Sequence, residues 1–227
     1  MKFSLRAELP QWIVIAAMFI AAAVSWPYAP ERMPTHWNLA GEVNGYGGKF
    51  TGLLVLPLTA LGIYVLMLVL PLVDPGRRNY QNFATAYNAI RMTILLVVAA
   101  IYVCLLVTAF GGKVNVTAIS SLLIAAMLLV IGNFLGKIRP NWFVGVRTPW
   151  TLSSKLSWNK THRLAGWLFM VMGLLVAAAG ILQTAWMFIL MLAVNGSCIV
   201  WMIVYSYLVY RRDPDRTSPA GVSPGAE

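Results

Sequence analysis

The stretch Asn133–Trp167, NFLGKIRPNWFVGVRTPWTLSSKLSWNKTHRLAGW, decides how the rest of the chain is arranged. It is the longest polar interruption in a chain of 227 residues that is 59% hydrophobic. Six Lys and Arg residues occur between positions 137 and 163 without any Asp or Glu, and Trp142, Trp150 and Trp158 lie among them. Each cation near anionic headgroups contributes about 1 kcal/mol, and indole rings anchor at the membrane interface. On residue chemistry alone, this stretch is predicted to be a loop that lies against a membrane surface.

Long apolar runs lie on both sides of this loop. Only 11% of the residues are charged, whereas soluble domains average about 25%. A run of about 20 apolar residues is long enough to cross the hydrocarbon core of a bilayer as a helix. The chain has six such runs, at Leu9–Tyr28, Gly52–Val73, Met92–Phe110, Val116–Gly136, Leu164–Gln183 and Ala185–Val209. The sequence therefore predicts an all-α integral membrane protein with six transmembrane helices, and it excludes a soluble globular domain.

The net charge of +10 is distributed unevenly along the chain. When the six runs are placed alternately across the membrane, 14 of the 17 Lys and Arg residues fall on one side, and only Arg32, Lys49 and Lys113 fall on the other. Short cytoplasmic loops carry the excess of Lys and Arg, so both termini are predicted to be cytoplasmic (N-in/C-in). The charge thus indicates topology, and no direct binding of nucleic acid is predicted.

The six predicted spans contain no Asp, Glu, Lys, Arg or His. Coupled transporters usually need such groups inside the membrane, so the pattern argues against proton- or ion-coupled transport. Cys104 and Cys198 lie in apolar runs without neighbouring Cys or His at metal-ligand spacing. No disulfide, bound metal or cofactor is therefore predicted. Asn133 and Asn195 are polar residues within spans, and each is predicted to form an interhelical hydrogen bond.

The loop from Ala29 to Thr51, on the side with few cations, holds a second polar pattern. Its prolines and glycines predict a turn-rich, non-helical segment. The side chains that could contact a peptide ligand or a metal ion are His36, Trp37, Asn38, Glu42 and Asn44. A zinc site needs three or four protein ligands, and this loop offers one His and one Glu. The alternative interpretation is structural: these side chains hydrogen-bond backbone groups and hold a cap over the helix ends.

Within the central loop, Thr148-Pro149 predicts a helix start, with threonine as N-cap and proline at the first helical position. The helix is predicted to lie along the membrane surface towards Asn159, with Trp150 and Trp158 on one face. Arg147 would stack on a tryptophan or bind a carboxylate or phosphate bidentately. His162 lacks a nearby acid and is predicted to be a packed, hydrogen-bonding residue rather than a general base.

The order of residues in this loop resembles the signature of the SdpI family of bacterial membrane immunity proteins. The matching strings are Gly132-Asn133, Pro140-Asn141, Gly145–Leu152 and Trp158-x-Lys160-Thr161-His162-Arg163. The resemblance assigns the signature to Asn133, Asn141, Gly145, Arg147, Thr148, Pro149, Trp150, Thr151, Trp158, Lys160, Thr161, His162 and Arg163. The outer loop, in turn, resembles a short domain of unknown function that often precedes the SdpI module. Its Pro-x-His-[Phe/Trp]-Asn-x-x-Gly pattern matches Pro34, His36, Trp37, Asn38 and Gly41, whereas Asn44 stands where that domain more often has Asp.

The resemblance implies a multi-pass protein of the bacterial plasma membrane that protects against a secreted antimicrobial peptide toxin. It also implies possible partners on both sides: the toxin at the outer loop and a cytoplasmic transcriptional repressor at the basic loop, in addition to the lipid bilayer. It implies no catalytic residue. Two alternatives stay open: a small-molecule transporter or channel, and a membrane enzyme that uses His36 and Glu42 or His162.

These observations divide the chain into four parts. Residues 1–51 form the first transmembrane helix and the outer loop, and residues 52–115 form the second and third helices. Residues 116–210 form the SdpI-like module, with its basic loop at residues 137–163. Residues 211–227 are rich in Arg and then in Ser, Pro and Gly, so they are predicted to be a disordered cytoplasmic tail.

Overall fold

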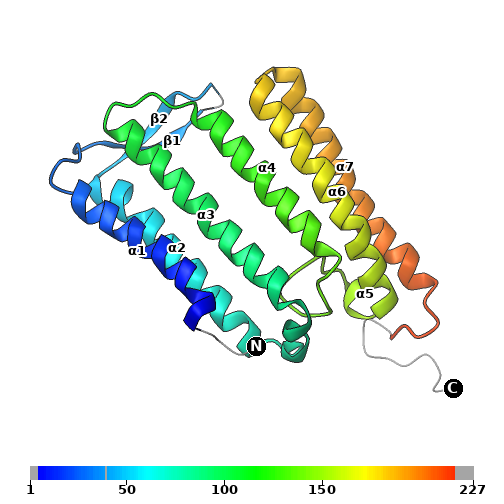
Figure 1. Cartoon of the computed structure of the whole chain (residues 1–227). Coiled ribbons are helices and arrows are strands. Elements are labelled where there is room, and N and C mark those ends of the chain that lie inside the picture. The colour runs from blue at the N-terminus through cyan, green and yellow to red at the C-terminus, as the bar shows by residue number, and fades with distance from the viewer. Residues whose placement is uncertain (1–4, 39, 218–227) are drawn as a thin grey trace.

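A computed structural model of the chain describes residues 5–38 and 40–217. In the described residues, six long helices run roughly side by side (Figure 1). They are α1 (Leu5–Ser25), α2 (Lys49–Val73), α3 (Ala84–Ala109), α4 (Val116–Leu135), α6 (Lys155–Leu182) and α7 (Ala185–Arg211). Each is long and apolar enough to cross a membrane. The predicted all-α membrane fold with six transmembrane helices is therefore confirmed.

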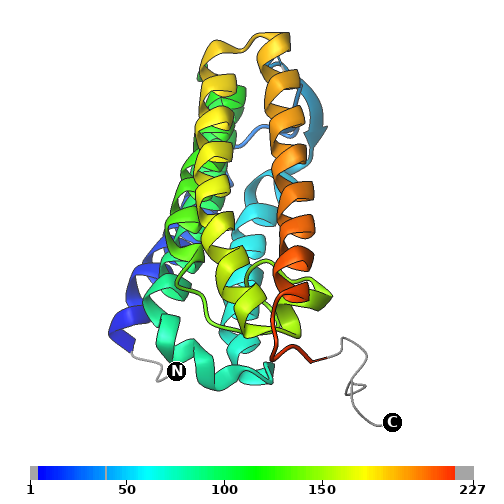
Figure 2. The ribbon, with the colours of Figure 1, turned by 90° about the vertical axis from the view of Figure 1, so that its right-hand side faces the viewer.

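The helices pack as two groups of three. Helices α1, α2 and α3 contact one another, α6 contacts both α4 and α7, and α3 joins the groups by packing on α4. The turned view shows α6 and α7 running side by side as a hairpin (Figure 2). Only Gln183 and Thr184 connect the two helices, and Gln183 adopts the left-handed conformation, with φ of 50°.

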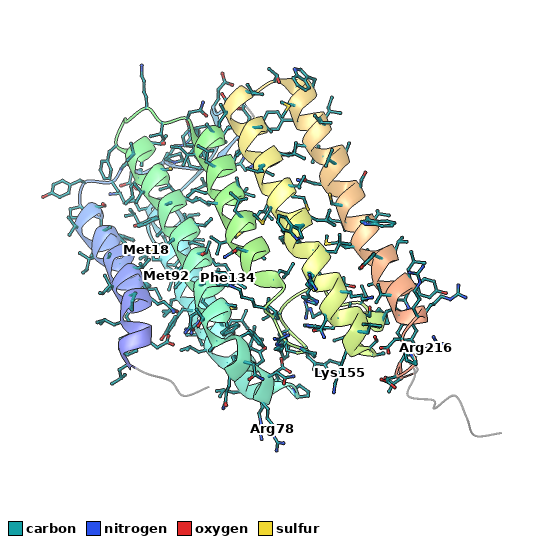
Figure 3. The ribbon with its side chains drawn as sticks, turned by 45° about the vertical axis from the view of Figure 1, so that its right-hand side comes forward. Met18, Arg78, Met92, Phe134, Lys155 and Arg216 are labelled. Carbon is teal, nitrogen blue, oxygen red and sulfur yellow. The ribbon has the colours of Figure 1, made fainter. Side chains whose placement is uncertain are left out.

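The two ends of the bundle differ in structure. One end, called the hairpin end below, carries strands β1 (Met33–Trp37) and β2 (Val43–Gly47) and the α3–α4 and α6–α7 turns (Figure 1). The other, called the loop end, carries the start of α1, the end of α7, the 3-10 helix η1 (Arg77–Phe83), the loop 136–148 and the short helix α5 (Pro149–Leu152). Arg78, Lys155 and Arg216 all lie at the loop end (Figure 3).

The β-hairpin was not predicted, although its loop was correctly expected to be non-helical. Strands β1 and β2 pair antiparallel, and the pairing is irregular around His36. The hairpin is held to the helices by Met33, whose side chain is fully buried in a cluster with Leu53 of α2 and Leu95 of α3. The sequence lacks a clean alternation of apolar and polar residues here, and tertiary packing of β1 on α2 and α3 supplies the missing stability.

A second buried cluster lies at the loop end and joins the two groups of helices. It contains Tyr80 and Tyr87 from the first group and Ile138, Trp158 and Met202 from the second. The tyrosine rings meet edge to face, with centroids 5.2 Å apart. The loop end is therefore a packed core rather than a set of solvated connections.

The start of the tail does not follow the prediction of disorder from residue 211. Asp213 is buried and accepts a hydrogen bond from the Ser154 hydroxyl. The Thr217 amide and hydroxyl both donate to the Ser153 carbonyl, each at 3.1 Å. Residues 213–217 thus fold back on the α5–α6 corner because they can satisfy polar groups there, and residues 218–227 lie outside the described residues.

Candidate functional site

The basic loop is folded around the side chain of Asn141. Its Nδ2 donates to the carbonyls of Arg139 and Val144, both at 2.9 Å. Its Oδ1 accepts from the amides of Phe143, at 2.9 Å, and Val144, at 2.6 Å. Buried backbone N–H and C=O groups need hydrogen-bond partners. In this loop the Asn141 side chain provides them for four backbone groups that do not pair with one another.

Asp74, directly after α2, fastens this loop to the first group of helices. Its Oδ2 accepts from the Tyr80 hydroxyl at 2.8 Å and from the Trp142 amide at 3.0 Å. Asn79 adds a bond from Nδ2 to the Pro140 carbonyl at 2.6 Å. Asp74 was not among the candidate residues predicted from the sequence. The sequence feature that could have indicated it is that Asp74 is an isolated acidic residue among the many cations of the loop end.

His162 is buried, and both of its ring nitrogens have hydrogen-bond partners. The Val146 amide donates to Nε2 at 3.1 Å, and Nδ1 lies 2.8 Å from the Trp158 carbonyl. Since Nε2 accepts, Nδ1 carries the proton of the neutral ring. The imidazole also stacks on Trp158, with centroids 4.1 Å apart. The predicted packed histidine is confirmed, and a general base at this position would have no free nitrogen.

Gly145 has the backbone that this contact requires. Its φ is +115°, and a Cβ at this position would lie 2.3 Å from His162 Nε2. Any side chain here would therefore meet both the left-handed backbone conformation and the imidazole ring.

Helix α5 begins as predicted but ends much earlier. Thr148 and Thr151 form a capping box, and Pro149 is at the start of the helix. Instead of continuing towards Asn159, the chain leaves the helix at Ser153, and Ser154 caps α6 by accepting from the Ser157 amide at 2.9 Å. Serine competes for backbone groups in this way, so it favours a cap over a helix interior.

The early end of α5 separates the two tryptophans that were predicted to share a face. Trp150 packs on Tyr207 of α7, with ring centroids 5.1 Å apart. Trp158 is fully buried within α6 and donates from Nε1 to the Ile138 carbonyl at 2.9 Å. The prediction of a common face was therefore wrong.

The thirteen signature residues divide into a buried scaffold and an exposed set. The buried residues are Asn141, Thr148, Thr151, Trp158, Thr161 and His162; Gly145 and Trp150 are half-buried; the exposed residues are Asn133, Arg147, Pro149, Lys160 and Arg163. Arg147 donates to the Trp142 carbonyl at 2.8 Å, so within the described residues it neither stacks on a tryptophan nor pairs with a carboxylate. The structure thus assigns half of the signature to folding and leaves its cations on the surface.

The two intramembrane asparagines do not form the predicted interhelical bonds. Asn133 is exposed on the outer surface of α4. The Oδ1 of Asn195 is buried without a hydrogen-bond partner among the described residues.

At the hairpin end, four of the five candidate ligand residues form two separate contacts. His36 Nδ1 lies 2.6 Å from Asn44 Oδ1. Asn38 and Glu42 are bonded twice, from Asn38 Nδ2 to Glu42 Oε2 at 3.0 Å and from the Glu42 amide to Asn38 Oδ1 at 2.9 Å. Within the described residues, no three His, Cys, Asp or Glu side chains gather to hold a metal. This arrangement favours the structural interpretation for four of the five residues.

Trp37, the fifth candidate, lines a pocket of about 450 Å³ between the hairpin and the α3–α4 turn. The lining residues are Trp37, Ala40, Gly41, Val43, Thr108, Gly112, Lys113, Val114 and Asn115. The Thr117 hydroxyl donates to the Asn38 carbonyl at 3.3 Å and ties this loop to the start of α4. The pocket places the indole of Trp37 and the ammonium group of Lys113 among small and apolar lining residues.

A buried ion pair lies among α1, α2 and α3 towards the loop end. Arg91 donates to Glu8 from Nη1 at 3.1 Å and from Nη2 at 2.7 Å, and both side chains are buried. The Arg91 guanidinium also lies over the rings of Tyr64 and Tyr87. The prediction that the spans contain no ionisable side chain was wrong, because α1 and α3 begin earlier in the chain than hydropathy placed them and so include Glu8 and Arg91.

Comparison with known proteins identifies two segments of the chain. Residues 137–206 match the SdpI/YfhL protein family, and residues 13–61 match a domain of unknown function, DUF1648. The chain is 25% identical over 206 residues to the immunity protein SdpI of Bacillus subtilis (strain 168), covering 88% of this chain and 94% of that protein. No solved structure matches the chain.

These matches confirm both resemblances and the localisation. The DUF1648 segment includes the β-hairpin, and the SdpI/YfhL segment includes all of the basic loop after Gly136. With six apolar helices, the chain is a multi-pass protein of the bacterial cell membrane. It resembles the SdpI/YfhL family over residues 137–206 and DUF1648 over residues 13–61, and it is similar to the immunity protein SdpI over most of its length.

Proposed function

We propose that this protein is a membrane immunity protein that protects a bacterium from a secreted antimicrobial peptide. The observation that carries the proposal is the likeness to the immunity protein SdpI, which extends over 88% of the chain and therefore includes both ends of the bundle. A shared loop alone would support only a shared fold.

In this proposal the hairpin end faces the outside of the cell and the loop end faces the cytoplasm. The distribution of cations supports this orientation, since 14 of the 17 Lys and Arg residues belong to the loop end and its neighbouring segments. A secreted peptide would then meet the hairpin end first.

The pocket beside Trp37 is the proposed peptide site. Trp37 offers an aromatic surface for an apolar side chain, and Lys113 at the rim offers a cation for a carboxylate or a carbonyl of the peptide. The pocket walls come from the hairpin and from the α3–α4 turn. A peptide bound there would touch two elements that run back through the bundle, and it would be held away from the lipid that it attacks.

The loop end is the proposed surface for a cytoplasmic repressor. Its exposed side chains include Arg77, Arg78, Arg139, Arg147 and Trp142, which suit an acidic protein surface with an apolar contact. Signalling would require two arrangements of the bundle, one of which binds the peptide better. Asp74 and Asn79 provide the link, because they connect the end of α2 and η1 to the basic loop.

The survival of a sensitive bacterium tests the immunity proposal. Cells that express the protein are challenged with a panel of purified membrane-active peptides from Gram-positive producers. We expect protection by the wild-type protein against at least one peptide, and loss of that protection in Trp37→Ala at equal membrane abundance. Tyr46→Ala is the matched control, since Tyr46 is an exposed aromatic residue of the same hairpin outside the pocket.

Either of two results would contradict the proposal. Wild-type protein that protects against no peptide would remove the immunity function. Equal loss of protection in Trp37→Ala and Tyr46→Ala would leave immunity standing but remove the pocket as its site.

A further inference from the structure

A groove on the outer surface of the α4–α6 pair carries a site that the immunity proposal does not use. It is a pocket of about 300 Å³ lined by Gly132, Asn133, Gly136, Arg163, Gly166, Trp167 and Met170. Two of its polar side chains, Asn133 and Arg163, are 30 positions apart in the chain, and the crossing of α4 and α6 brings them together.

Close contact between the two helices forms the floor of this groove. A Cβ at Gly132 would lie 2.8 Å from the Gly166 carbonyl oxygen, so the backbones of α4 and α6 touch at this point. At Gly136 the nearest atom to such a Cβ is Cγ of Arg163, at 3.6 Å. The aliphatic part of the Arg163 side chain therefore packs over Gly136, directly after the end of α4.

The groove lies at the level where headgroups meet hydrocarbon. Arg163 follows Lys155 by eight residues, which corresponds to about 12 Å along α6, and the apolar part of α6 begins directly after it at Leu164. Phe134, the neighbour of Asn133, lies on α4 further along the bundle from the loop end than Lys155 (Figure 3). Trp167, one turn beyond Arg163, is 71% exposed, as expected of an indole at the membrane interface.

The Arg163 charge has no partner within the described part of the protein. The ion pairs there join Lys49 to Glu31 and Arg91 to Glu8, and the sequence has no acidic residue between Asp74 and Asp213. Asn133 is also exposed, and its side chain lines the same groove. A guanidinium and an amide at the edge of the hydrocarbon need polar partners, and water becomes scarce at that depth.

We infer that this groove binds the headgroup of an anionic phospholipid. The Arg163 guanidinium can donate two parallel N–H hydrogen bonds to the oxygens of a phosphodiester. The Asn133 side-chain amide lines the same pocket and can donate to a phosphate or glycerol oxygen. An acyl chain would then follow the surface of Trp167 and Met170. Two further exposed cations, Lys160 on α6 and Lys137 shortly after the end of α4, favour an anionic over a zwitterionic headgroup.

Native mass spectrometry of the full-length protein with added lipid tests this inference. The probes are phosphatidylglycerol and phosphatidylcholine with identical acyl chains. We expect the wild-type protein to retain phosphatidylglycerol preferentially, and Arg163→Gln to lower its affinity about tenfold, the scale of a lost charge-assisted pair. Asn133→Leu, which suits a lipid-facing surface, is expected to lower the affinity by a smaller factor.

Lys155→Gln is the matched control, because it removes one exposed cation from the same helix outside the groove. It should keep the wild-type affinity within about twofold, as expected of a distant, solvated charge. An equal loss in Lys155→Gln and Arg163→Gln would show that binding follows total charge and would overturn the site. Equal retention of the two lipids by the wild-type protein would also overturn it. The melting temperature of each variant, measured without added lipid, separates these results from misfolding.

Discussion

At the scale of single residues, the basic loop depends on the fit between Gly145 and His162. Gly145 has a left-handed backbone, and a Cβ added to it would lie only 2.3 Å from His162 Nε2, so there is no room for a side chain. Gly145→Ala is therefore expected to destabilise the protein by about 1–3 kcal/mol, the cost of a strained backbone position. Thermal unfolding in detergent measures this loss.

Gly196→Ala is the control for that measurement. Gly196 lies within α7, and a Cβ there would meet no atom within 4 Å. The substitution should leave stability unchanged or raise it slightly, since alanine favours helix by about 1 kcal/mol over glycine. Equal melting temperatures for Gly145→Ala and the wild-type protein would contradict the packing described here.

The Glu8–Arg91 pair gives a second residue-scale prediction. Removal of one partner leaves a buried charge without compensation, which typically costs about 3–5 kcal/mol. We expect Glu8→Gln and Arg91→Met each to be strongly destabilising, and the double substitution to be less destabilising than the sum of the two. A double-mutant cycle on unfolding free energies measures the coupling. Additive effects would show that the pair does not hold α1 to α3.

At the scale of elements, the packing of α4 on α6 depends on Gly132. A Cβ at this position would lie 2.8 Å from the Gly166 carbonyl oxygen, so the helices would have to separate. Gly132→Ala is expected to cost about 1–3 kcal/mol, as overpacked sites do, even though alanine is the better helix former. The measurement is the midpoint of thermal unfolding.

Gly136→Ala, one turn further along the chain, serves as the comparison. The nearest atom to its Cβ would be 3.6 Å away, an ordinary contact with the Arg163 stem. Its stability should therefore match the wild-type protein. Similar losses in the two variants would show that close approach at Gly132 is not the reason for the loss.

The helices could be predicted from sequence much better than their ends and connections. Hydropathy alone located all six, because a spanning helix must be apolar over nearly its whole length. It placed the start of α3 at Met92, whereas the helix begins at Ala84, and this error hid Arg91. A polar residue at the end of a spanning helix cannot be distinguished from a loop residue by hydropathy, unless its partner on another helix is known.

The candidate sites could be predicted only in part, for a similar reason. Family resemblance found the residues of the basic loop, and the Thr148 cap followed from local chemistry. Asp74, the β-hairpin and the return of Asp213 to Ser154 depend on partners 59 to 68 positions away or on packing against other helices. Such contacts leave no local pattern, so a single sequence cannot indicate them.

At the scale of the whole molecule, the structure separates two polar ends by a wide apolar region. The hairpin end is a small capped surface with one pocket beside Trp37, and the loop end is a packed core that presents cations. An immunity function requires the first end to be outside the cell, where the peptide is. Orientation is therefore the claim on which the proposed peptide site and the proposed repressor surface both depend.

Cysteine labelling in intact cells tests that orientation most directly. The native thiols of Cys104 and Cys198 are buried, so Glu42→Cys and Lys155→Cys place single exposed thiols at the hairpin end and the loop end. With a membrane-impermeant maleimide, we predict labelling of Glu42→Cys in intact cells and labelling of Lys155→Cys only after the membrane is permeabilised. Labelling of Lys155→Cys from outside intact cells would reverse the topology and contradict the proposed peptide site.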